Sequence, residues 1–267
     1  MEVLQLTATQ FIKPMSTGRN RPLLLGCENA TGDRLEVVVK FRGREMNEKA
    51  QVAELVTAQL ADDLGLQVPQ AAVVDVPAGF EAVVAERELT KLVKGSPGIN
   101  FGSVHLGVGF TTWPAGRNPV GAQRDHAADI FAFDTVIQNP DRRAANPNLW
   151  ARSDRLGVYD HEQAFSFLSV PVIGGAPKPW ATASYRNGFR FLEQHVFYGS
   201  LRGSRLNLGP FQEKLGALTN KEIQGYLNAI PTGWREGSGF CEEIAGYLHE
   251  ARQHSEGLID FVKHILR

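Results

Sequence analysis

Residues 138–149 read QNPDRRAANPNL, and this stretch carries more functional information than any other part of the chain. It directly follows a segment in which apolar side chains recur at helical spacing, so we expect a buried helix that ends where the stretch begins. Those apolar positions are Ile130, Phe133 and Ile137. Within the stretch, Asp141 and Asn146 follow the pattern Asp-x-x-x-x-Asn, which puts a carboxylate and an amide in one short loop.

A second acidic residue, Asp160, lies downstream of this loop. The runs 148–151 and 156–159 between them can form a β-hairpin around the turn Arg152-Ser153-Asp154. Such a hairpin returns the chain to its starting point and brings Asp160 close to Asn146. We therefore expect Asp141, Asn146 and Asp160 to converge at one end of the hairpin.

Phosphoryl transfer requires a set of groups of this kind. One carboxylate accepts the proton of the attacking hydroxyl or orients it, while a second carboxylate and an amide oxygen hold Mg²⁺ on the phosphates. The Asp-x-x-x-x-Asn spacing matches the catalytic loop of protein kinases, and a metal-binding Asp belongs at the end of a strand, as Asp160 does. The sequence therefore favours phosphotransfer chemistry.

The first part of the chain has mostly strand patterns with one helix. Residues 35–41 are β-branched and apolar between turn residues and predict a strand, with residues 22–27 as a weaker strand that can pair with it. Residues 47–64 have apolar positions at helical spacing, with Asn47 as N-cap and Gly65 as the stop. Two further apolar runs, 71–76 and 81–85, predict strands. The order β, β, α, β, β describes a small antiparallel sheet that carries one helix.

This first part also supplies the remaining groups that phosphoryl transfer needs. A lysine within a strand should reach the phosphates and pair with a glutamate on the helix that follows. Lys40 ends the run Val37-Val38-Val39-Lys40, and Glu54 lies in the middle of the predicted helix. Both residues are therefore in the positions that the chemistry requires.

The rest of the chain is predicted to be loops and helices. Residues 89–122 are rich in Gly and Pro, which is typical of a connector and a loop-rich surface. Helices are predicted over residues 211–217, 220–229 and 240–266, and Thr219 and Glu222 form a capping box for the second.

Taken together, these motifs resemble the HipA-like kinases, in the compact branch built from little more than the kinase core. The motifs are Val39-Lys40-Phe41, the helix with Glu54, Asn139-x-Asp141-Arg142-x-x-x-Asn146 and Asp160-His161. The catalytic-loop motif is also similar to that of phosphatidylinositol kinases. The resemblance implies an α+β, two-lobed protein-kinase-like fold. Its small antiparallel β lobe with one helix would span residues 1–88, and its larger, mainly helical lobe residues 89–267.

The resemblance also implies an activity, cofactors and residue roles. A HipA-like kinase uses ATP with Mg²⁺ and transfers the γ-phosphate to a Ser/Thr hydroxyl of a protein substrate. On this carry-over Asp141 is the catalytic base, Asn146 and Asp160 bind Mg²⁺, Lys40 contacts the ATP phosphates and Glu54 positions Lys40. The phosphate-covering loop would be Ser16-Thr17-Gly18-Arg19-Asn20, before the first strand, and Ser16 and Thr17 are candidate self-phosphorylation sites.

Two alternatives to a protein kinase stay open. Arg143 stands where many relatives have His, His161-Glu162 replaces Phe-Gly after Asp160, and Gly18 is the one glycine of the candidate nucleotide loop. These departures are compatible with a nucleotide-binding pseudokinase that acts as an interaction module. The phosphatidylinositol-kinase-like loop is compatible with a small molecule or a lipid headgroup as acceptor. Asn139 and Arg142 are interpreted as residues that brace the loop.

Composition excludes several other classes. The chain has 267 residues, 43% of them hydrophobic and 21% charged, which is typical of a globular protein. Its formal net charge of −1 gives no general basic surface for nucleic acid. No apolar run has the length of a membrane span, and no signal-peptide pattern opens the sequence. We therefore expect a cytoplasmic protein that binds neither nucleic acid nor membrane.

Overall fold

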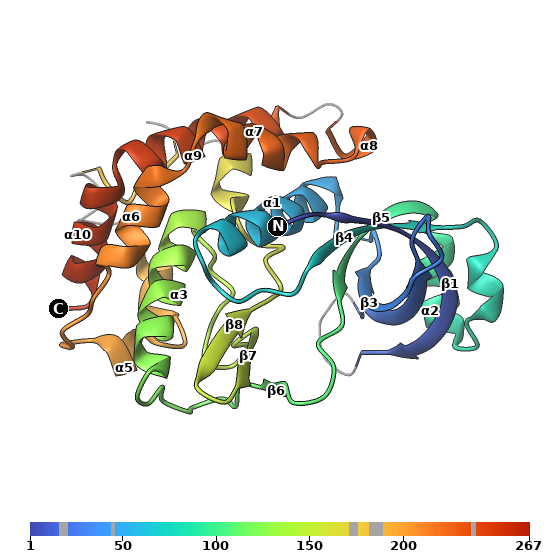
Figure 1. Ribbon diagram of the computed structural model, residues 1–267, viewed down its shortest axis with the longest axis horizontal. Coiled ribbons are helices and arrows are strands. Elements are labelled where there is room, and N and C mark those ends of the chain that lie inside the picture. The colour runs from blue at the N-terminus through green and yellow to red at the C-terminus, as the bar shows by residue number, and fades with distance from the viewer. Residues whose placement is uncertain (16–20, 44–45, 171–175, 182–188, 236–238) are drawn as a thin grey trace.

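The computed structural model describes residues 1–267 except 16–20, 44–45, 171–175, 182–188 and 236–238. A β-barrel forms one end of the molecule and a group of helices forms the other, with helix α1 (Glu48–Asp63) between them (Figure 1). A small sheet lies on the helical side of the barrel. None of the helices in the described ranges is long and apolar enough to cross a membrane.

The barrel has five strands in the closed order β1-β2-β3-β5-β4. Their bounds are β1 Leu4–Pro14, β2 Leu23–Glu28, β3 Arg34–Lys40, β4 Ala71–Val76 and β5 Gly98–Val104. Neighbouring strands are antiparallel except β1 and β4, which pair in parallel from Leu4 to Thr7 and close the barrel. Buried aliphatic side chains such as Leu25, Val37 and Val74 fill the interior.

The expectation of a small antiparallel sheet with one helix is corrected in three respects. The sheet is a barrel that a parallel pair closes. Residues 81–85 are not a strand, because the chain turns at Gly79 (φ 90°) into the 3₁₀-helix η1 (Phe80–Val83). The predicted connector over 89–122 holds most of helix α2 (Arg87–Lys94) and all of β5.

Close packing of β3 and β4 against β5 explains why β5 contains a glycine, Gly102, that obscures its strand pattern. A Cβ atom on Gly102 would lie 2.7 Å from a methyl carbon of Val37 and 2.8 Å from one of Val74. Glycine is used in a strand where backbone and neighbouring side chains approach this closely. The glycine that reads as a chain breaker is therefore a packing requirement.

Helix α1 follows the sequence pattern. The Asn47 side chain accepts a hydrogen bond of 3.0 Å from the backbone N–H of Ala50, which satisfies one of the free donors at the helix start. Gly65, with φ of 82°, ends the helix in the left-handed conformation that glycine adopts most easily. Most of the helix is buried, and it contacts β4 and β5 on one side and helices α7 (Asn220–Asn228) and α8 (Thr232–Arg235) on the other.

The predicted hairpin is present. Strands β7 (Leu149–Arg152) and β8 (Arg155–Val158) are antiparallel, with Ser153 at φ 54° in the turn, and the short β6 (Thr111–Thr112) pairs with β7. Helix α3 (Gln123–Ile137) precedes the hairpin and ends at Gln138, which has the left-handed backbone conformation, with φ of 49°. These elements flank the stretch 138–149 on both sides.

The C-terminal third is helical, as expected, but the last predicted helix is two helices. The remaining elements are η2 Ser166–Ser169, η3 Arg190–Gln194, α5 Tyr198–Leu201, α6 Gly209–Ala217, α9 Phe240–Gln253 and α10 Ser255–Ile265. The break lies at His254, which stacks on Trp180. Buried positions recur at helical spacing on both sides of the break, in α9 and in α10, and this continuity hid it from the sequence pattern.

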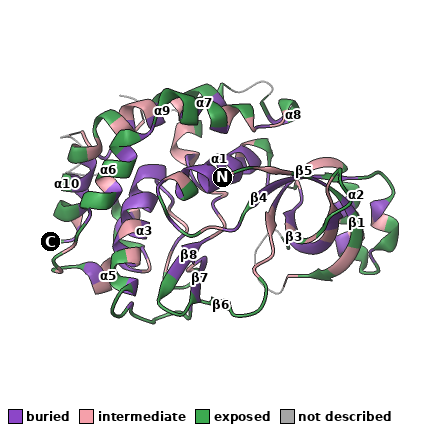
Figure 2. Cartoon of the chain, viewed as in Figure 1, coloured by how far each residue is buried: buried purple, intermediate pink, exposed green. Residues whose placement is uncertain are grey.

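Figure 2 shows that α1 is largely buried. The buried hydrophobic residues form two clusters, and α1 belongs to the larger one. The smaller cluster fills the barrel and extends to η1 and α2. The larger cluster joins α1 to α3 and the C-terminal helices. The division of the chain at residues 88 and 89 stays a prediction.

Candidate active site

A single lysine connects three elements of the fold. Lys40 is the last residue of β3, Glu54 lies in the middle of α1, and Asp160 follows β8. The Lys40 Nζ donates hydrogen bonds to a carboxylate oxygen of Glu54 and of Asp160, and it lies 3.6 Å from Oε2 of Glu162. The Lys40 side chain is 10% exposed and that of Glu54 2%, so this is a nearly dry ion-pair cluster.

Burial and charge act against each other in this cluster. Burial raises the pKa of Glu54 to about 7, although the Lys40 charge opposes the shift. Burial would also raise the pKa of Asp160, but the charge and hydrogen bond of Lys40 outweigh it, so this pKa is lowered. Burial disfavours the ammonium of Lys40, yet the three carboxyl groups raise its pKa. One cation therefore faces three acidic groups, a balance that favours binding of a further cation.

Asp141 and Asn146 lie together in the catalytic-loop stretch. The Asn146 amide nitrogen donates to Oδ2 of Asp141 at 2.8 Å, and the Arg143 guanidinium donates to Oδ1 at 2.9 Å. Backbone hydrogen bonds in both directions between Arg143 and Asn146, of 3.2 and 3.0 Å, close the loop into a tight turn. Both carboxylate oxygens of Asp141 therefore have a partner within its own loop.

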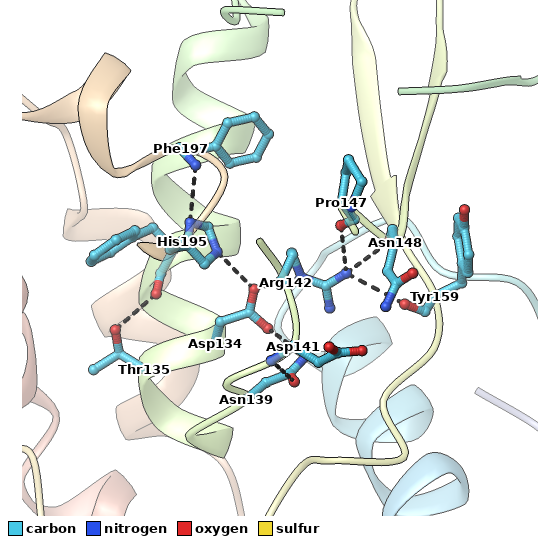
Figure 3. A network of polar contacts seen from close by, with 11 residues as sticks. Asp134, Thr135, Asn139, Asp141, Arg142, Pro147, Asn148, Tyr159, His195 and Phe197 are labelled. Carbon is cyan, nitrogen blue, oxygen red and sulfur yellow. Dashed lines mark hydrogen bonds and ion pairs between the residues drawn. The ribbon is translucent and has the colours of Figure 1, made fainter. Parts of the chain in front are cut away.

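A buried polar network holds this loop in place (Figure 3). Arg142 is 1% exposed, and its Nε donates to Oδ2 of Asp134, in the last turn of α3. Its Nη1 donates to the carbonyl oxygens of Asn148, at 2.6 Å, and Tyr159, at 3.3 Å. Asn139 completes the loop, since its Oδ1 accepts from the N–H of Asp141 at 3.1 Å. Arg142 and Asn139 thus brace the loop, as the sequence indicated.

The network also includes a residue from a distant part of the chain. His195 Nε2 lies 2.9 Å from Oδ2 of Asp134, and its Nδ1 accepts from the backbone N–H of Phe197 at 3.1 Å. Burial would raise the pKa of Asp134, but the Arg142 charge and the His195 hydrogen bond outweigh it and lower this pKa. Burial lowers the pKa of His195 despite the nearby carboxylate. The pair is therefore an ionised Asp134 and a neutral His195.

The predicted residues fall into two groups that Arg142 connects. Lys40, Glu54 and Asp160 form one group, and Asp141 and Asn146 form the other. No hydrogen bond among the described residues joins Asn146 directly to Asp160. Instead, Arg142 binds the carbonyl of Tyr159, the residue before Asp160. The two groups are therefore connected indirectly, through the hydrogen bond from Arg142 to the backbone of Tyr159.

The candidate nucleotide loop, with Ser16, Thr17 and Gly18, lies outside the described residues. The expectation that it precedes the first strand is wrong, because β1 ends at Pro14 and β2 begins at Leu23, and the loop connects these two strands. Strand β1 was missed although Leu4 to Thr9 alternate apolar and polar residues, with Leu6 and Ala8 buried; its pairing with β2 becomes irregular after Ala8.

The oxygen ligands at the site fit a magnesium ion. Carboxylate oxygens of Glu54, Asp160 and Glu162 lie within 4.8 Å of one another. Magnesium prefers hard oxygen ligands and binds through one or two carboxylates together with substrate phosphates. Because the amide nitrogen of Asn146 donates to Asp141, its carbonyl oxygen is the atom that can serve as a ligand. Of the two predicted metal residues, Asp160 belongs to this carboxylate group and Asn146 does not, so the metal role of both stays a prediction.

Sequence reasoning missed three residues of the site. Glu162 approaches Lys40, and its spacing from Asp160, Asp-x-Glu, was a readable signal of a second carboxylate at this position. Asp134 and His195 gave no local signal. An Asp within an apolar helix and a His in an irregular segment become informative only when the fold brings them to Arg142.

The fold is that of a kinase-like protein. The crystal structure of a Helicobacter pylori proinflammatory kinase, CtkA, superposes with a TM-score of 0.54 at 11% identity, covering 98% of this chain and 97% of that one. At this identity the likeness concerns the fold alone. The structure of an apo pseudokinase matches with a TM-score of only 0.33 at 11% identity, over 99% of this chain and 94% of that one.

A model of the HipA-like kinase family matches residues 8–169, more than half of the chain. The protein therefore belongs to the HipA-like kinase family, which confirms the resemblance noted in its motifs. The matched region contains Lys40, Glu54, Asp141, Asn146 and Asp160. None of the curated proteins compared with the chain matches it.

Proposed function

We propose that this protein is an ATP- and Mg²⁺-dependent kinase that phosphorylates a serine or threonine hydroxyl of a protein substrate. The observation that supports the proposal most is the bonding of Lys40 to both Glu54 and Asp160, which come from α1 and from the end of β8. A strand lysine paired with a helix glutamate, beside a carboxylate suited to a metal, is the arrangement that phosphoryl transfer in kinases requires.

Each residue has a defined task in this proposal. Asp141 accepts the proton of the acceptor hydroxyl while the hydroxyl oxygen forms the new bond to the γ-phosphorus. The bond from the γ-phosphorus to the bridging oxygen of ADP breaks. Lys40 neutralises phosphate charge, and Glu54 keeps the ammonium in place. Asn146 and Asp160 would hold Mg²⁺, which supplies charge neutralisation on the phosphates when bound.

The test combines nucleotide binding with product mass. We expect Mg·ATP to raise the melting temperature of the wild type and of Asp141→Asn, but not of Asp160→Asn. Intact mass after incubation should show added phosphate on the protein or on a supplied acceptor for the wild type alone. Asp154→Asn, the same substitution in the exposed hairpin turn, is the matched control and should behave as wild type. No melting shift in the wild type at millimolar Mg·ATP would reject the nucleotide site.

One observation favours a second candidate, a nucleotide-binding pseudokinase. Arg143 and Asn146 each donate to one carboxylate oxygen of Asp141, so a substrate hydroxyl has to compete with them for the remaining lone pairs. Stabilisation by Mg·ATP with no added phosphate on any acceptor would favour this candidate. Arg143→Ala frees one oxygen, and phosphotransfer that appears only in this variant would identify the arginine as the block.

Phosphotransfer to a small molecule or to a lipid headgroup is a third outcome of the same experiment. It would leave the protein mass and the protein acceptors unchanged while ADP accumulates only when that acceptor is added. Mass spectrometry of the acceptors separates it from protein phosphorylation.

A further inference from the structure

His195 is connected to the catalytic loop in two ways, through its side chain by way of Asp134 and through its backbone. Its ring is buried, with 5% of the residue exposed, and it meets Phe131 edge-on at 4.8 Å between ring centroids. Because the N–H of Phe197 donates to Nδ1, the single ring proton is on Nε2, where it donates to Oδ2 of Asp134. The tautomer is therefore fixed by the backbone of the same segment.

The backbone around His195 binds the loop directly as well. The N–H of Val196 donates to the carbonyl of Arg142 at 3.0 Å, and His195 forms an antiparallel bridge with Arg143. Both partners follow Asp141 immediately in the chain. Asp134, held by His195, is also the carboxylate that fixes the Arg142 side chain. The loop is thus held by α3, through Asp134, and by residues 195–196, through backbone hydrogen bonding.

We infer that His195 is a positioning residue for the base Asp141, acting through Asp134 and Arg142. It does not touch the reacting atoms. The inference rests on the proposed function for its effect on the rate, while its effect on the loop can be measured without nucleotide. A catalytic carboxylate must be held within a fraction of an ångström, because a misplacement of 1 Å costs about a hundredfold in rate.

Two substitutions separate the two nitrogens of the ring. The side-chain nitrogen of glutamine lies near the position of Nε2, so His195→Gln keeps a donor to Asp134. The side-chain oxygen of asparagine lies near the position of Nδ1, so His195→Asn keeps the acceptor for Phe197 but leaves Asp134 without this donor. Leu215→Ala, in α6, is the control for general destabilisation. It removes buried volume from the larger hydrophobic cluster, which also contains Phe131, but Leu215 takes no part in the polar network around Asp134.

We expect His195→Asn to lower kcat by about tenfold to a hundredfold with little change in the KM for ATP, because the loop and not the nucleotide site is disturbed. His195→Gln should stay within about threefold of the wild-type kcat, and Leu215→Ala should leave kcat unchanged while lowering the melting temperature. In the nucleotide-free protein, hydrogen exchange at residues 141–146 should quicken in His195→Asn but not in His195→Gln.

Wild-type kcat and wild-type exchange in His195→Asn would overturn the inference. Equal losses in the Asn, Gln and Leu215→Ala proteins would also overturn it, since they would report stability alone. If the wild type transfers no phosphate, the proposed function fails, and the exchange experiment still decides the inference. Faster exchange of the loop in His195→Asn alone would support the positioning of the loop by His195 in a protein that is not a kinase.

Discussion

Buried charges in this protein differ in how completely they are neutralised. Asp134 has a guanidinium and an imidazole N–H on one oxygen, and Lys40 is shared by several carboxylates. Asp129, on α3, has only partial compensation from the charge of Lys214. These differences decide how each residue responds to substitution and to pH.

Asp129 should make the protein less stable at neutral pH. It borders a cavity of about 140 Å³, and burial raises its pKa from 3.8 to about 6 despite Lys214. The folded protein therefore keeps a proton that the unfolded chain releases near pH 4. Stability from this group is full below pH 4 and is lost as the pH rises through about 6. Asp129→Asn should unfold at higher urea than wild type at pH 7 and lose that advantage near pH 4.

The control for Asp129 is Asp154→Asn, in the exposed hairpin turn, whose urea midpoint should parallel wild type at every pH. An Asp129→Asn protein with an advantage that does not depend on pH would contradict the assigned cause, because a neutral carboxyl and an amide should be nearly equivalent at low pH.

Arg142 should be irreplaceable by lysine. Its guanidinium binds a carboxylate through Nε and, through Nη1, the carbonyls of Pro147, Asn148 and Tyr159, and one ammonium cannot reproduce this geometry. Arg142→Lys leaves buried acceptors without donors, and we expect a loss of about 3 kcal/mol or more in the free energy of unfolding. Arg117→Lys, where the exposed guanidinium lies over the Trp113 ring, should cost less than about 1 kcal/mol. Similar urea midpoints for the two variants would refute this.

Among the secondary-structure elements, β5 has a tight packing constraint at Gly102. Gly102→Ala forces a methyl group against Val37 and Val74 inside a closed barrel, where β3 and β4 cannot move apart independently. We expect a loss of about 1–3 kcal/mol. Gly225→Ala, in α7, meets open space and should stabilise by about 0.5–1 kcal/mol through helix propensity. Chemical denaturation of both proteins tests the contrast, which would fail if both substitutions had the same sign.

Elements with local signals were predictable, and those defined by distant contacts were not. The Asn47 cap, the Gly65 stop and the hairpin turn at Ser153 each depend on a few neighbouring residues. Strand β5 and the break at His254 depend on what packs against them. The same distinction applies to the site: Lys40, Asp141 and Asp160 follow family spacing, whereas Asp134 and His195 are 61 residues apart and meet only in the folded protein.

At the scale of the molecule, α1 should unfold with the helices and not with the barrel. It shares the larger hydrophobic cluster, although it lies between two barrel strands in the sequence. Leu25→Ala, inside the barrel, should therefore quicken native-state hydrogen exchange in β1–β3 and leave α1 protected. Ile244→Ala, in α9, should quicken exchange in α1 instead. Exchange of α1 that follows the barrel variant would place Glu54 in the same cooperative unit as Lys40.

The parallel pairing of β1 with β4 has a consequence for self-association. Each barrel strand has a neighbour on both sides, so the folded barrel offers no backbone edge to which a second molecule could add a strand. Detachment of β1 would uncover the edges of both β2 and β4 at once. Fraying of β1 would therefore expose strand edges at which molecules could exchange strands or aggregate. The short parallel pairing from Leu4 to Thr7 thus protects the protein against aggregation.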